Sequence, residues 1–197
     1  MIRALYGGSF DPVHAGHLAV IGRLLADGLA DRVLVVPAHR SPLKDEACSA
    51  SGAERLHMLR LALDDPALDD PALAARRDRV EVDPREVTAG RAVPTVETLD
   101  QLAVEHPDGR WRLVIGGDHA GQFDRWRHPD RLLELAEVVV VSRGPLDLAP
   151  PLAGRARLIT DFAHPAEASE LRAMLRAGRR PPRSLLPPVV TDHIVAR

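Results

Sequence analysis

The chain of 197 residues contains one cysteine, and its aromatic residues amount to only 3% of the total. A disulfide within the chain needs two cysteines, so the lone Cys48 excludes such a bond. A single cysteine is typical of a protein in the reducing cytoplasm, and we expect a cytoplasmic location. No apolar run approaches the length of a membrane span, and the N-terminus lacks the pattern of a signal peptide. We therefore expect no association with a membrane.

The balance of charge excludes a further class of protein. The formal net charge is −2 at pH 7, which argues against a protein that binds nucleic acid through a large basic surface. Hydrophobic residues make up 45% of the chain and charged residues 27%, a composition typical of a folded globular protein. The length is sufficient for one hydrophobic core, so we expect a single domain over residues 1–197.

Lysine is nearly absent: Lys44 is the one lysine among 26 basic residues, and all the others are arginine. A lysine supplies a compact, flexible point charge, whereas an arginine supplies a planar fork. A single lysine among so many arginines therefore hints at a specific contact, such as one with phosphate. A solvated lysine on a loop is the alternative explanation.

Short β-branched runs, bounded by Gly, Pro or charged residues, alternate along the chain with segments of helical periodicity. The runs predict strands at residues 2–6, 32–36, 80–82, 112–115, 138–141 and 157–159. The periodic segments predict helices at residues 18–29, 54–63, 96–104, 130–135, 166–177 and 189–196. This alternation predicts an α/β fold, a Rossmann-like parallel sheet with helices on both faces, whose C-terminal portion from about residue 160 is helical.

Two segments interrupt the alternation. Residues 64–79 contain the near-repeat DDPALDDPALAARR, which we expect to form a surface excursion between a helix and a strand because the duplication is too short for a solenoid. Residues 144–154 are rich in Pro, Leu and Gly and predict a loop after the fifth strand.

The segment GGSFDPVHAGHL, residues 7–18, joins the first predicted strand to the first predicted helix. Glycines let a backbone approach a ligand closely, and a helix N-terminus offers unpaired N–H groups and a partial positive charge. His14 and His17, in the pattern HxGH, can add further donors. The segment therefore predicts a nucleotide-phosphate site; the alternative is that both histidines only cap the helix.

Two further features favour a ligand site. Gly116, Gly117 and Asp118 follow a predicted strand at its carboxyl end, where ligands bind in open α/β sheets. Asp118 is a candidate for a ribose contact, with a helix N-cap as the alternative. Trp126, one of two tryptophans, could supply a flat partner for a ring or could only pack. The histidines show no metal-site spacing, and no Ser/His/Asp nucleophile emerges.

These segments, in this order, resemble the HxGH/TxGH nucleotidyltransferases and, over nearly the full length, the bacterial nicotinate-nucleotide adenylyltransferases. The resemblance rests on residues 7–18, 35–45 (VVPAHRSPLKD), 53–63 (AERLHMLRLAL), 94–102 (PTVETLDQL), 113–144 and 184–194. It implies transfer of an adenylyl group from ATP to nicotinate mononucleotide with the help of Mg²⁺, giving nicotinate adenine dinucleotide and pyrophosphate. The implied partners are small molecules, and a homo-oligomer is an open possibility.

Carried over position by position, the resemblance implies roles for particular residues. The implied catalytic residues are His14, His17 and Lys44. The implied ATP and phosphate contacts are Gly7, Gly8, Ser9, Phe10, Gly16, Ser169 and Arg172. The implied contacts with the nucleotide or the acceptor are Thr95, Gly117, Asp118 and Trp126. No protein ligand to a metal is implied.

The chain departs from the family pattern near its C-terminus. The family usually has Ile-Ser-Ser-Thr-x-Ile-Arg at the start of a helix that binds ATP phosphates, whereas residues 166–172 here are AEASELR. Two hydroxyls are absent, and Glu167 adds a negative charge. The alternatives are therefore a different acceptor, nicotinamide mononucleotide or phosphopantetheine, or a nucleotide-binding homologue with reduced or lost turnover. Phosphopantetheine enzymes usually have threonine at the place of His14.

Overall fold

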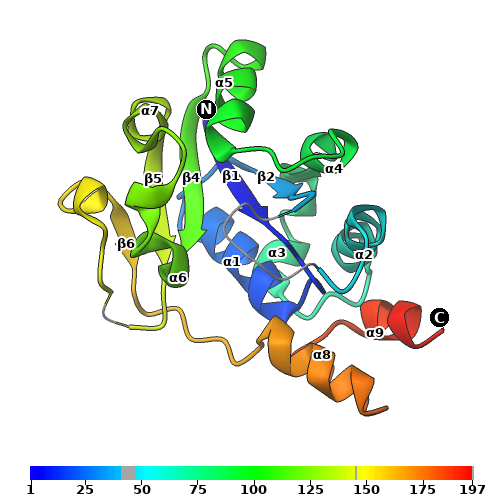
Figure 1. The fold of residues 1–197 in the computed structure, drawn as a ribbon. Coiled ribbons are helices and arrows are strands. Elements are labelled where there is room, and N and C mark those ends of the chain that lie inside the picture. The colour runs from blue at the N-terminus through cyan, green and yellow to red at the C-terminus, as the bar shows by residue number, and fades with distance from the viewer. Residues whose placement is uncertain (41–47, 145, 197) are drawn as a thin grey trace.

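Parallel strands form one sheet in the computed structural model, in the order β3-β2-β1-β4-β5-β6 (Figure 1). The structure describes residues 1–40, 48–144 and 146–196. The order reverses direction between β1 and β4, as in doubly wound sheets, where this reversal opens a crevice at the carboxyl ends of the strands. The strands are β1 (Ile2–Gly8), β2 (Arg32–Pro37), β3 (Val80–Val82), β4 (Arg110–Gly116), β5 (Ala136–Val141) and β6 (Arg157–Ile159).

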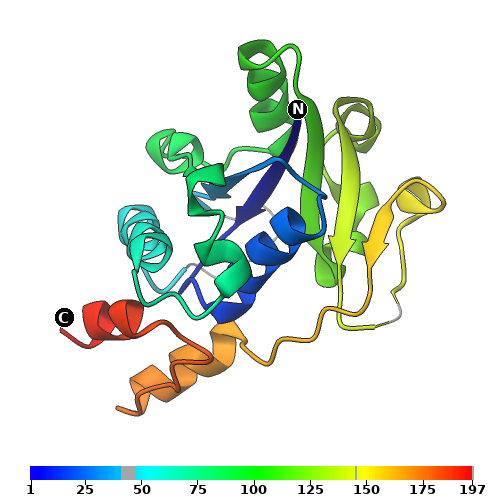
Figure 2. The same cartoon turned by 180° about the vertical axis from the view of Figure 1, so that it is seen from behind.

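Helices cover both faces of the sheet, as Figures 1 and 2 show from opposite sides. The helices are α1 (Ala15–Ala26), α2 (Gly52–Asp64), α3 (Pro71–Ala74), α4 (Arg85–Thr88), α5 (Thr95–Glu105), α6 (Gly117–Ala120), α7 (Pro129–Leu135), α8 (Ala168–Arg176) and α9 (Pro188–Val195). Strand residues alternate between the two cores: Val139 belongs to the cluster that includes residues of α1, α2 and α3, whereas Val138 and Val140 belong to the one that includes residues of α5 and α7. Both faces are covered along the middle of the sheet, which is why residues 138–141 of β5 form an apolar run without alternation, whereas charged residues such as Arg110 and Glu137 stand near the starts of the strands.

The predicted Rossmann-like fold is confirmed, and each predicted strand and helix is present, β3 and β6 with the predicted ends and the others with ends shifted by one to three residues. Helix α1 begins at Ala15 instead of residue 18, because His14 already occupies its N-cap position. It ends at Ala26 instead of residue 29, and Gly28 just beyond has a positive φ of 65°. The sequence analysis missed α3, α4 and α6, since four-residue helices are too short to show a helical period.

The prediction for residues 64–79 was wrong in part, because α3 within this segment belongs to the core. Leu73 is fully buried and lies in the same cluster as the apolar face of α1. Asp70 caps α3 by accepting the N–H of Leu73 at 2.9 Å. A Cβ on Gly22 of α1 would lie 2.6 Å from the Asp70 carboxylate, so the two helices approach each other closely. The second copy of the repeat is therefore structural.

The C-terminal helices share this core. Leu171 of α8 and Val190 of α9 belong to the cluster that α1 and α2 line. The backbone N–H of Ala15 donates to the carbonyl of Leu185 at 3.0 Å, which joins the C-terminal segment to the start of α1. Among the described residues, no helix is long and apolar enough to cross a membrane.

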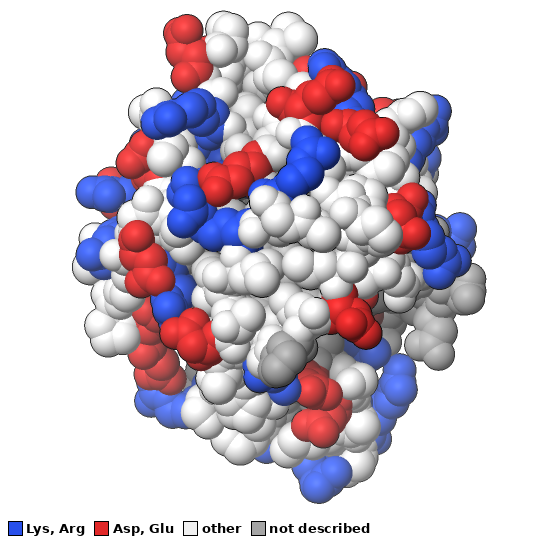
Figure 3. Space-filling view, turned by 90° about the vertical axis from the view of Figure 1, so that its left-hand side faces the viewer, with Lys and Arg blue, Asp and Glu red and all other residues white. Residues whose placement is uncertain are grey.

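Charged side chains of both signs are interspersed on the face that carries α7 and β6 (Figure 3). Arg131 of α7 pairs with Asp100 at 2.9 Å, and Arg157 of β6 pairs with Glu137 at 3.0 Å. These pairs are half exposed, so each contributes only on the order of 0–1 kcal/mol to stability.

Leu73→Ala should lower the free energy of unfolding by about 2–5 kcal/mol, because it removes a fully buried side chain between α3 and α1. Urea denaturation measures this change. Leu68→Ala, at the same place in the first copy of the repeat but only partly buried, is the matched control and should cost clearly less. Equal losses in both variants would contradict the structural distinction between the two copies.

Candidate active site

Two cavities open side by side where β1 and β4 end. The larger has a volume of about 360 Å³ and the smaller about 170 Å³, and both are lined by Val114, Ile115 and Gly116. β1 ends at Gly7 and Gly8, next to the end of β4. The crevice predicted by the strand order is therefore a pair of adjoining cavities.

The larger cavity combines an aromatic wall with a helix N-terminus. Trp126 lines it together with Thr95, the first residue of α5. The indole N–H of Trp126 is buried and has no hydrogen-bond partner in the described structure. Pro94 precedes Thr95 and supplies no side-chain cap; the N–H of Glu97 donates to the carbonyl of Pro94 at 2.9 Å, so the N–H groups of Thr95 and Val96 are the ones that a ligand could use. The arrangement favours a flat ring that carries an anionic group.

The smaller cavity is lined by imidazoles. The rings of His14 and His17 stack with centroids 3.7 Å apart at an angle of 25°. The backbone N–H of His14 donates to Nδ1 of His17 at 3.2 Å, so the neutral form of His17 carries its proton on Nε2. Phe10 packs edge-on against His17 with ring centroids 4.9 Å apart. These contacts hold His17 with its Nε2–H as a donor.

The protonation of the site follows from its burial. Burial above all, and then the neighbouring His164 and Arg143, lower the pKa of His14 to about 4, so this imidazole is neutral at pH 7. Burial and the charge of Asp118 raise the pKa of the Tyr6 phenol, which therefore keeps its proton. The smaller cavity consequently presents neutral imidazole and phenol groups beside the guanidinium of Arg143.

Gly16 in the HxGH pattern is required by space. A Cβ at this position would lie 3.1 Å from the His14 ring and 3.2 Å from Nδ1 of His164. Because both rings converge on this point, a larger residue would displace at least one of them. The structure thus gives Gly16 a packing reason beyond the backbone contact with phosphate that the resemblance implies.

Arg55 of α2 is a site residue that the sequence analysis missed. Its guanidinium is fully buried and donates four hydrogen bonds to backbone carbonyls. Nη1 donates to Ser9 at 2.6 Å and to Ala38 at 2.7 Å, Nη2 to His39 at 2.8 Å, and Nε to Ala50 at 3.2 Å. Arg55 therefore joins the glycine turn after β1, the end of β2 and the start of α2.

Asp11 adds a second connection between the same segments. Its buried carboxylate accepts the backbone N–H groups of Ser49 at 2.6 Å and Ala50 at 3.2 Å. The two interactions fix the chain just after residues 41–47. Lys44 lies in that segment, outside the described residues, so its catalytic role stays a prediction.

The structure brings most of the predicted site residues to the two cavities. Gly7, Gly8, Ser9, Thr95 and Trp126 line the larger one, and His14, Gly16 and His17 line the smaller. Phe10 is buried beneath the turn, and a Cβ on Gly8 would lie 3.1 Å from its ring. Its side chain therefore supports the turn, and any ligand contact would come from its backbone.

The remaining predicted residues lie outside these two linings. Gly117 packs so closely that a Cβ would lie 2.6 Å from Leu146. Asp118 is exposed, 3.7 Å from Nε2 of His119. Ser169 is exposed on α8, and Arg172 donates from Nη1 to the carbonyl of Asp11 at 2.7 Å. The ligand contacts expected of these four residues stay predictions.

The extra negative charge of Glu167 has a partner. Arg143, at the end of β5, pairs with Glu167 at 2.9 Å and lines the smaller cavity together with His164. Arg143 and His164 are further site residues that sequence analysis missed. Their separation along the chain gave no signal, and His164 stood among several histidines without a recognisable pattern.

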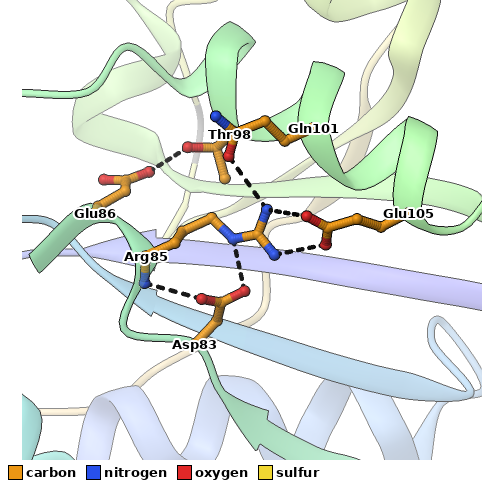
Figure 4. A network of polar contacts seen from close by, with 6 residues as sticks. All are labelled: Asp83, Arg85, Glu86, Thr98, Gln101 and Glu105. Atoms are coloured by element: carbon orange, nitrogen blue, oxygen red, sulfur yellow. Dashed lines mark hydrogen bonds and ion pairs between the residues drawn. The ribbon is translucent and has the colours of Figure 1, made fainter. Parts of the chain in front are cut away.

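A buried carboxylate, Glu86 of α4, forms part of the wall of the larger cavity. The hydroxyl of Thr98 donates to its Oε1 at 2.7 Å, as Figure 4 shows. Burial raises the pKa of Glu86. In the same network Arg85 donates to Asp83 at 2.6 Å and to Glu105 at 2.7 Å. The network holds α4 against α5, whose N-terminus faces the cavity.

The chemistry of the smaller cavity does not provide ligands for Mg²⁺. Its side chains offer imidazole and guanidinium nitrogens, whereas Mg²⁺ prefers carboxylate and phosphate oxygens. Within the described ranges, no group of three or more His, Cys, Asp or Glu residues could hold a metal ion.

The fold and the cavities define a nucleotide-binding α/β protein, and comparison with known proteins specifies its class. The chain matches the cytidylyltransferase-like family over residues 5–173 and belongs to that family. A structure titled Plasmodium falciparum nicotinic acid mononucleotide adenylyltransferase complexed with NaAD has the same fold, with a TM-score of 0.76 at 17% identity. The similarity covers 99% of this chain and 95% of that one.

Sequence relatives place the chain more narrowly. Probable nicotinate-nucleotide adenylyltransferases of Chlorobium luteolum and Gemmatimonas aurantiaca are 34% and 31% identical to it, over 98% of this chain and 95% and 89% of theirs. That of Rhodopirellula baltica is 36% identical over 71% of this chain, which spans 60% of the relative's length. The chain belongs to the nicotinate-nucleotide adenylyltransferase family.

Arg55→Ala should lower the free energy of unfolding by about 3–5 kcal/mol, because it removes a fully buried side chain and leaves four part-buried carbonyls without their donor. Urea denaturation provides the measurement. Arg60→Ala on the exposed side of the same helix is the control, and its effect should stay within about 0.5 kcal/mol. A loss below about 1 kcal/mol for Arg55→Ala would show that these bonds do not support the site.

The buried, neutral His14 predicts a loss of stability in acid. Its pKa is about 4 in the folded protein against 6.5 ordinarily, so the unfolded chain binds the proton more tightly. The contribution of neutral His14 to the free energy of unfolding is therefore fully present above about pH 6.5. It falls as the pH drops toward 4, and about 2 kcal/mol of it is lost at pH 5.

Urea denaturation of the wild type and of His14→Asn at pH 7 and pH 5 tests this expectation. The loss of stability between the two pH values should be smaller by about 2 kcal/mol in the variant, which has no imidazole to protonate there. An NMR titration of His14 with a midpoint near 6.5 would contradict the prediction.

Proposed function

We propose that the protein transfers the adenylyl group of ATP to nicotinate mononucleotide, releasing pyrophosphate and forming nicotinate adenine dinucleotide. The observation that carries this proposal is the junction of two unlike cavities at Gly116. One offers a tryptophan wall and a helix N-terminus, and the other offers imidazole donors. A ring-bearing mononucleotide in the first and a triphosphate in the second would meet at the carboxyl ends of β1 and β4.

In the proposed reaction, an oxygen of the acceptor's 5′-phosphate attacks the α-phosphorus of ATP. A new P–O bond forms, the bond between the α-phosphorus and its bridging oxygen breaks, and pyrophosphate leaves with the electron pair. Such a transfer needs positioning and charge stabilisation more than a protein nucleophile. His14 and His17, which line the smaller cavity, would contact the triphosphate, and the Nε2–H of His17 would donate to the developing charge.

Mg²⁺, bound to the phosphates of ATP, would supply additional charge neutralisation. The chain's own contribution is to orient the two phosphates. Arg55 and Asp11 fix the glycine turn and the start of α2, so the backbone around Ser9 keeps one geometry. Lys44 would add a positive charge to the phosphate contacts.

The larger cavity favours nicotinate over other acceptors. Its Trp126 can lie against a pyridine ring, and the N-terminus of α5 carries a partial positive charge that complements the nicotinate carboxylate. Nicotinamide mononucleotide, which lacks that charge, would lose this interaction. Phosphopantetheine has no flat ring for Trp126. The names of the relatives agree with nicotinate mononucleotide. The proposal includes a cytoplasmic location, and a homo-oligomer stays an open prediction.

His17→Ala should lower kcat for dinucleotide formation by about 10²–10³-fold while leaving the protein folded, because it removes a donor to the reacting phosphate. A coupled assay of pyrophosphate release, with ATP, Mg²⁺ and a panel of acceptors, measures the rate. His106→Gln, at the far, amino-terminal end of β4, is the control and should keep the wild-type rate.

The same panel tests the proposed function itself. The wild type should use nicotinate mononucleotide better than nicotinamide mononucleotide and should not use phosphopantetheine. Tight binding of ATP without turnover of any acceptor would instead identify a nucleotide-binding homologue that has lost the reaction. Wild-type kcat in His17→Ala would remove His17 from the mechanism.

A further inference from the structure

The segment between β6 and α8 brings a third histidine to the imidazole pair of the smaller cavity. Figures 1 and 2 show this segment passing from β6 across to α8, close to the start of α1. His164 lies within it and lines the smaller cavity together with His14 and His17. The rings of His14 and His164 both lie within 3.2 Å of the position that a Cβ of Gly16 would occupy. The two side chains therefore converge from opposite ends of the sequence.

A backbone hydrogen bond fixes the tautomer of His164 in which Nε2 carries the proton. The N–H of Ala166 donates to Nδ1 of His164 at 3.2 Å, so the neutral imidazole carries its proton on Nε2. Burial, and then the charge of Arg143, lower the pKa of His164 and favour this neutral form. His17 has the same arrangement, because its Nδ1 accepts the N–H of His14. Two imidazoles in one cavity are thus fixed in the same tautomer by backbone amides.

The cavity around His164 is built for an anion. Apart from Tyr6, its described polar side chains are nitrogen donors: His14, His17, Arg143 and His164. No acidic side chain lines the described part of this cavity. Arg143 is held in place by Glu167 at 2.9 Å and by the carbonyl of Ala166 at 3.3 Å. The carboxylate of Glu167 therefore orients the guanidinium of Arg143 and does not itself line the cavity.

No hydroxyl group of the described residues at the start of α8 lines the smaller cavity as a donor to an anion. Ser169 is the one hydroxyl-bearing residue between residues 164 and 172, and it is exposed and lines neither cavity. Among the described residues, His164 and Arg143 are the polar side chains that line the smaller cavity from the segments after β5 and before α8.

We propose that His164 is a nucleotide-binding residue of this enzyme, which donates from Nε2 to a phosphate oxygen of bound ATP beside His14 and His17. The assignment rests on the proposed function for the identity of the nucleotide. It makes the anion site a cluster of three imidazoles and one guanidinium, assembled from α1, the end of β5 and the segment before α8.

A matched pair of substitutions separates binding from a purely structural role. In His164→Asn, the side-chain oxygen can still accept the N–H of Ala166 near the position of Nδ1, but no donor remains at the position of Nε2. In His164→Gln, the longer amide can place an N–H donor near Nε2. Calorimetry with ATP and Mg²⁺, without acceptor, should show a 10- to 100-fold weaker Kd for His164→Asn, the effect of one lost hydrogen bond to a charged group. His164→Gln should recover most of this loss.

Steady-state kinetics provides a second readout. His164→Asn should raise the KM for ATP and leave the KM for nicotinate mononucleotide within about twofold of the wild type, because the acceptor occupies the other cavity. His106→Asn is the control and should change neither constant, since its ring lies beside Trp111 away from both cavities. Urea denaturation shows whether each variant keeps wild-type stability.

The outcomes distinguish this proposal from the proposed function. A Kd for ATP within twofold of the wild type in His164→Asn overturns the role of His164, whatever the acceptor. Equal losses of affinity in the Asn and Gln variants, accompanied by lost stability, also overturn it and assign His164 to the folding of the segment. A wild type that binds ATP but forms no dinucleotide overturns the function and leaves the ATP titrations as the test of His164.

Discussion

The reversal of strand order between β1 and β4 is the constraint on which the rest of the molecule depends. It places the glycine ends of two neighbouring strands side by side with no strand or helix crossing between them. The backbone can then approach a ligand from both strands, and a cavity forms on each side of Gly116. A different neighbour for β1 would separate the histidines of α1 from the tryptophan wall beyond β4.

Buried polar interactions hold the loops that this reversal leaves at the edge of the sheet. Arg55 satisfies carbonyls of two loops at once, and Asp11 satisfies amides at the start of α2. Neither residue forms an ion pair in the described structure; each charged group is balanced by backbone dipoles instead. A buried charge in this arrangement is costly to leave unpaired, so the loops cannot move independently without a large loss of stability.

The two cavities differ in electrostatics in a way that agrees with the two substrates proposed above. The larger one relies on a helix N-terminus and an indole N–H, and a buried Glu86 reinforces its wall through Thr98. The smaller one relies on imidazoles kept neutral by burial and on one guanidinium. Neutral donors already aligned by backbone amides need little reorganisation when charge develops on a phosphate, which is the condition for effective stabilisation of a transition state.

The amino-acid sequence by itself determined the strands, the longer helices and the part of the site that surrounds His14 and His17. Apolar runs of strand length predicted each strand, and the local pattern around His14 and His17 predicted a donor-lined turn, because both depend on neighbours within a few residues. Short helices such as α3 escaped because four residues carry no period. Only the tertiary structure decided that Leu73 belongs to the core and that Arg55 hydrogen-bonds to the turn after β1, the end of β2 and the start of α2. It also decided that Arg143 and His164 lie in one cavity with His14 and His17. Those contacts join residues far apart in the chain, and their existence depends on the order in which the strands pair, which no local pattern of residues specifies.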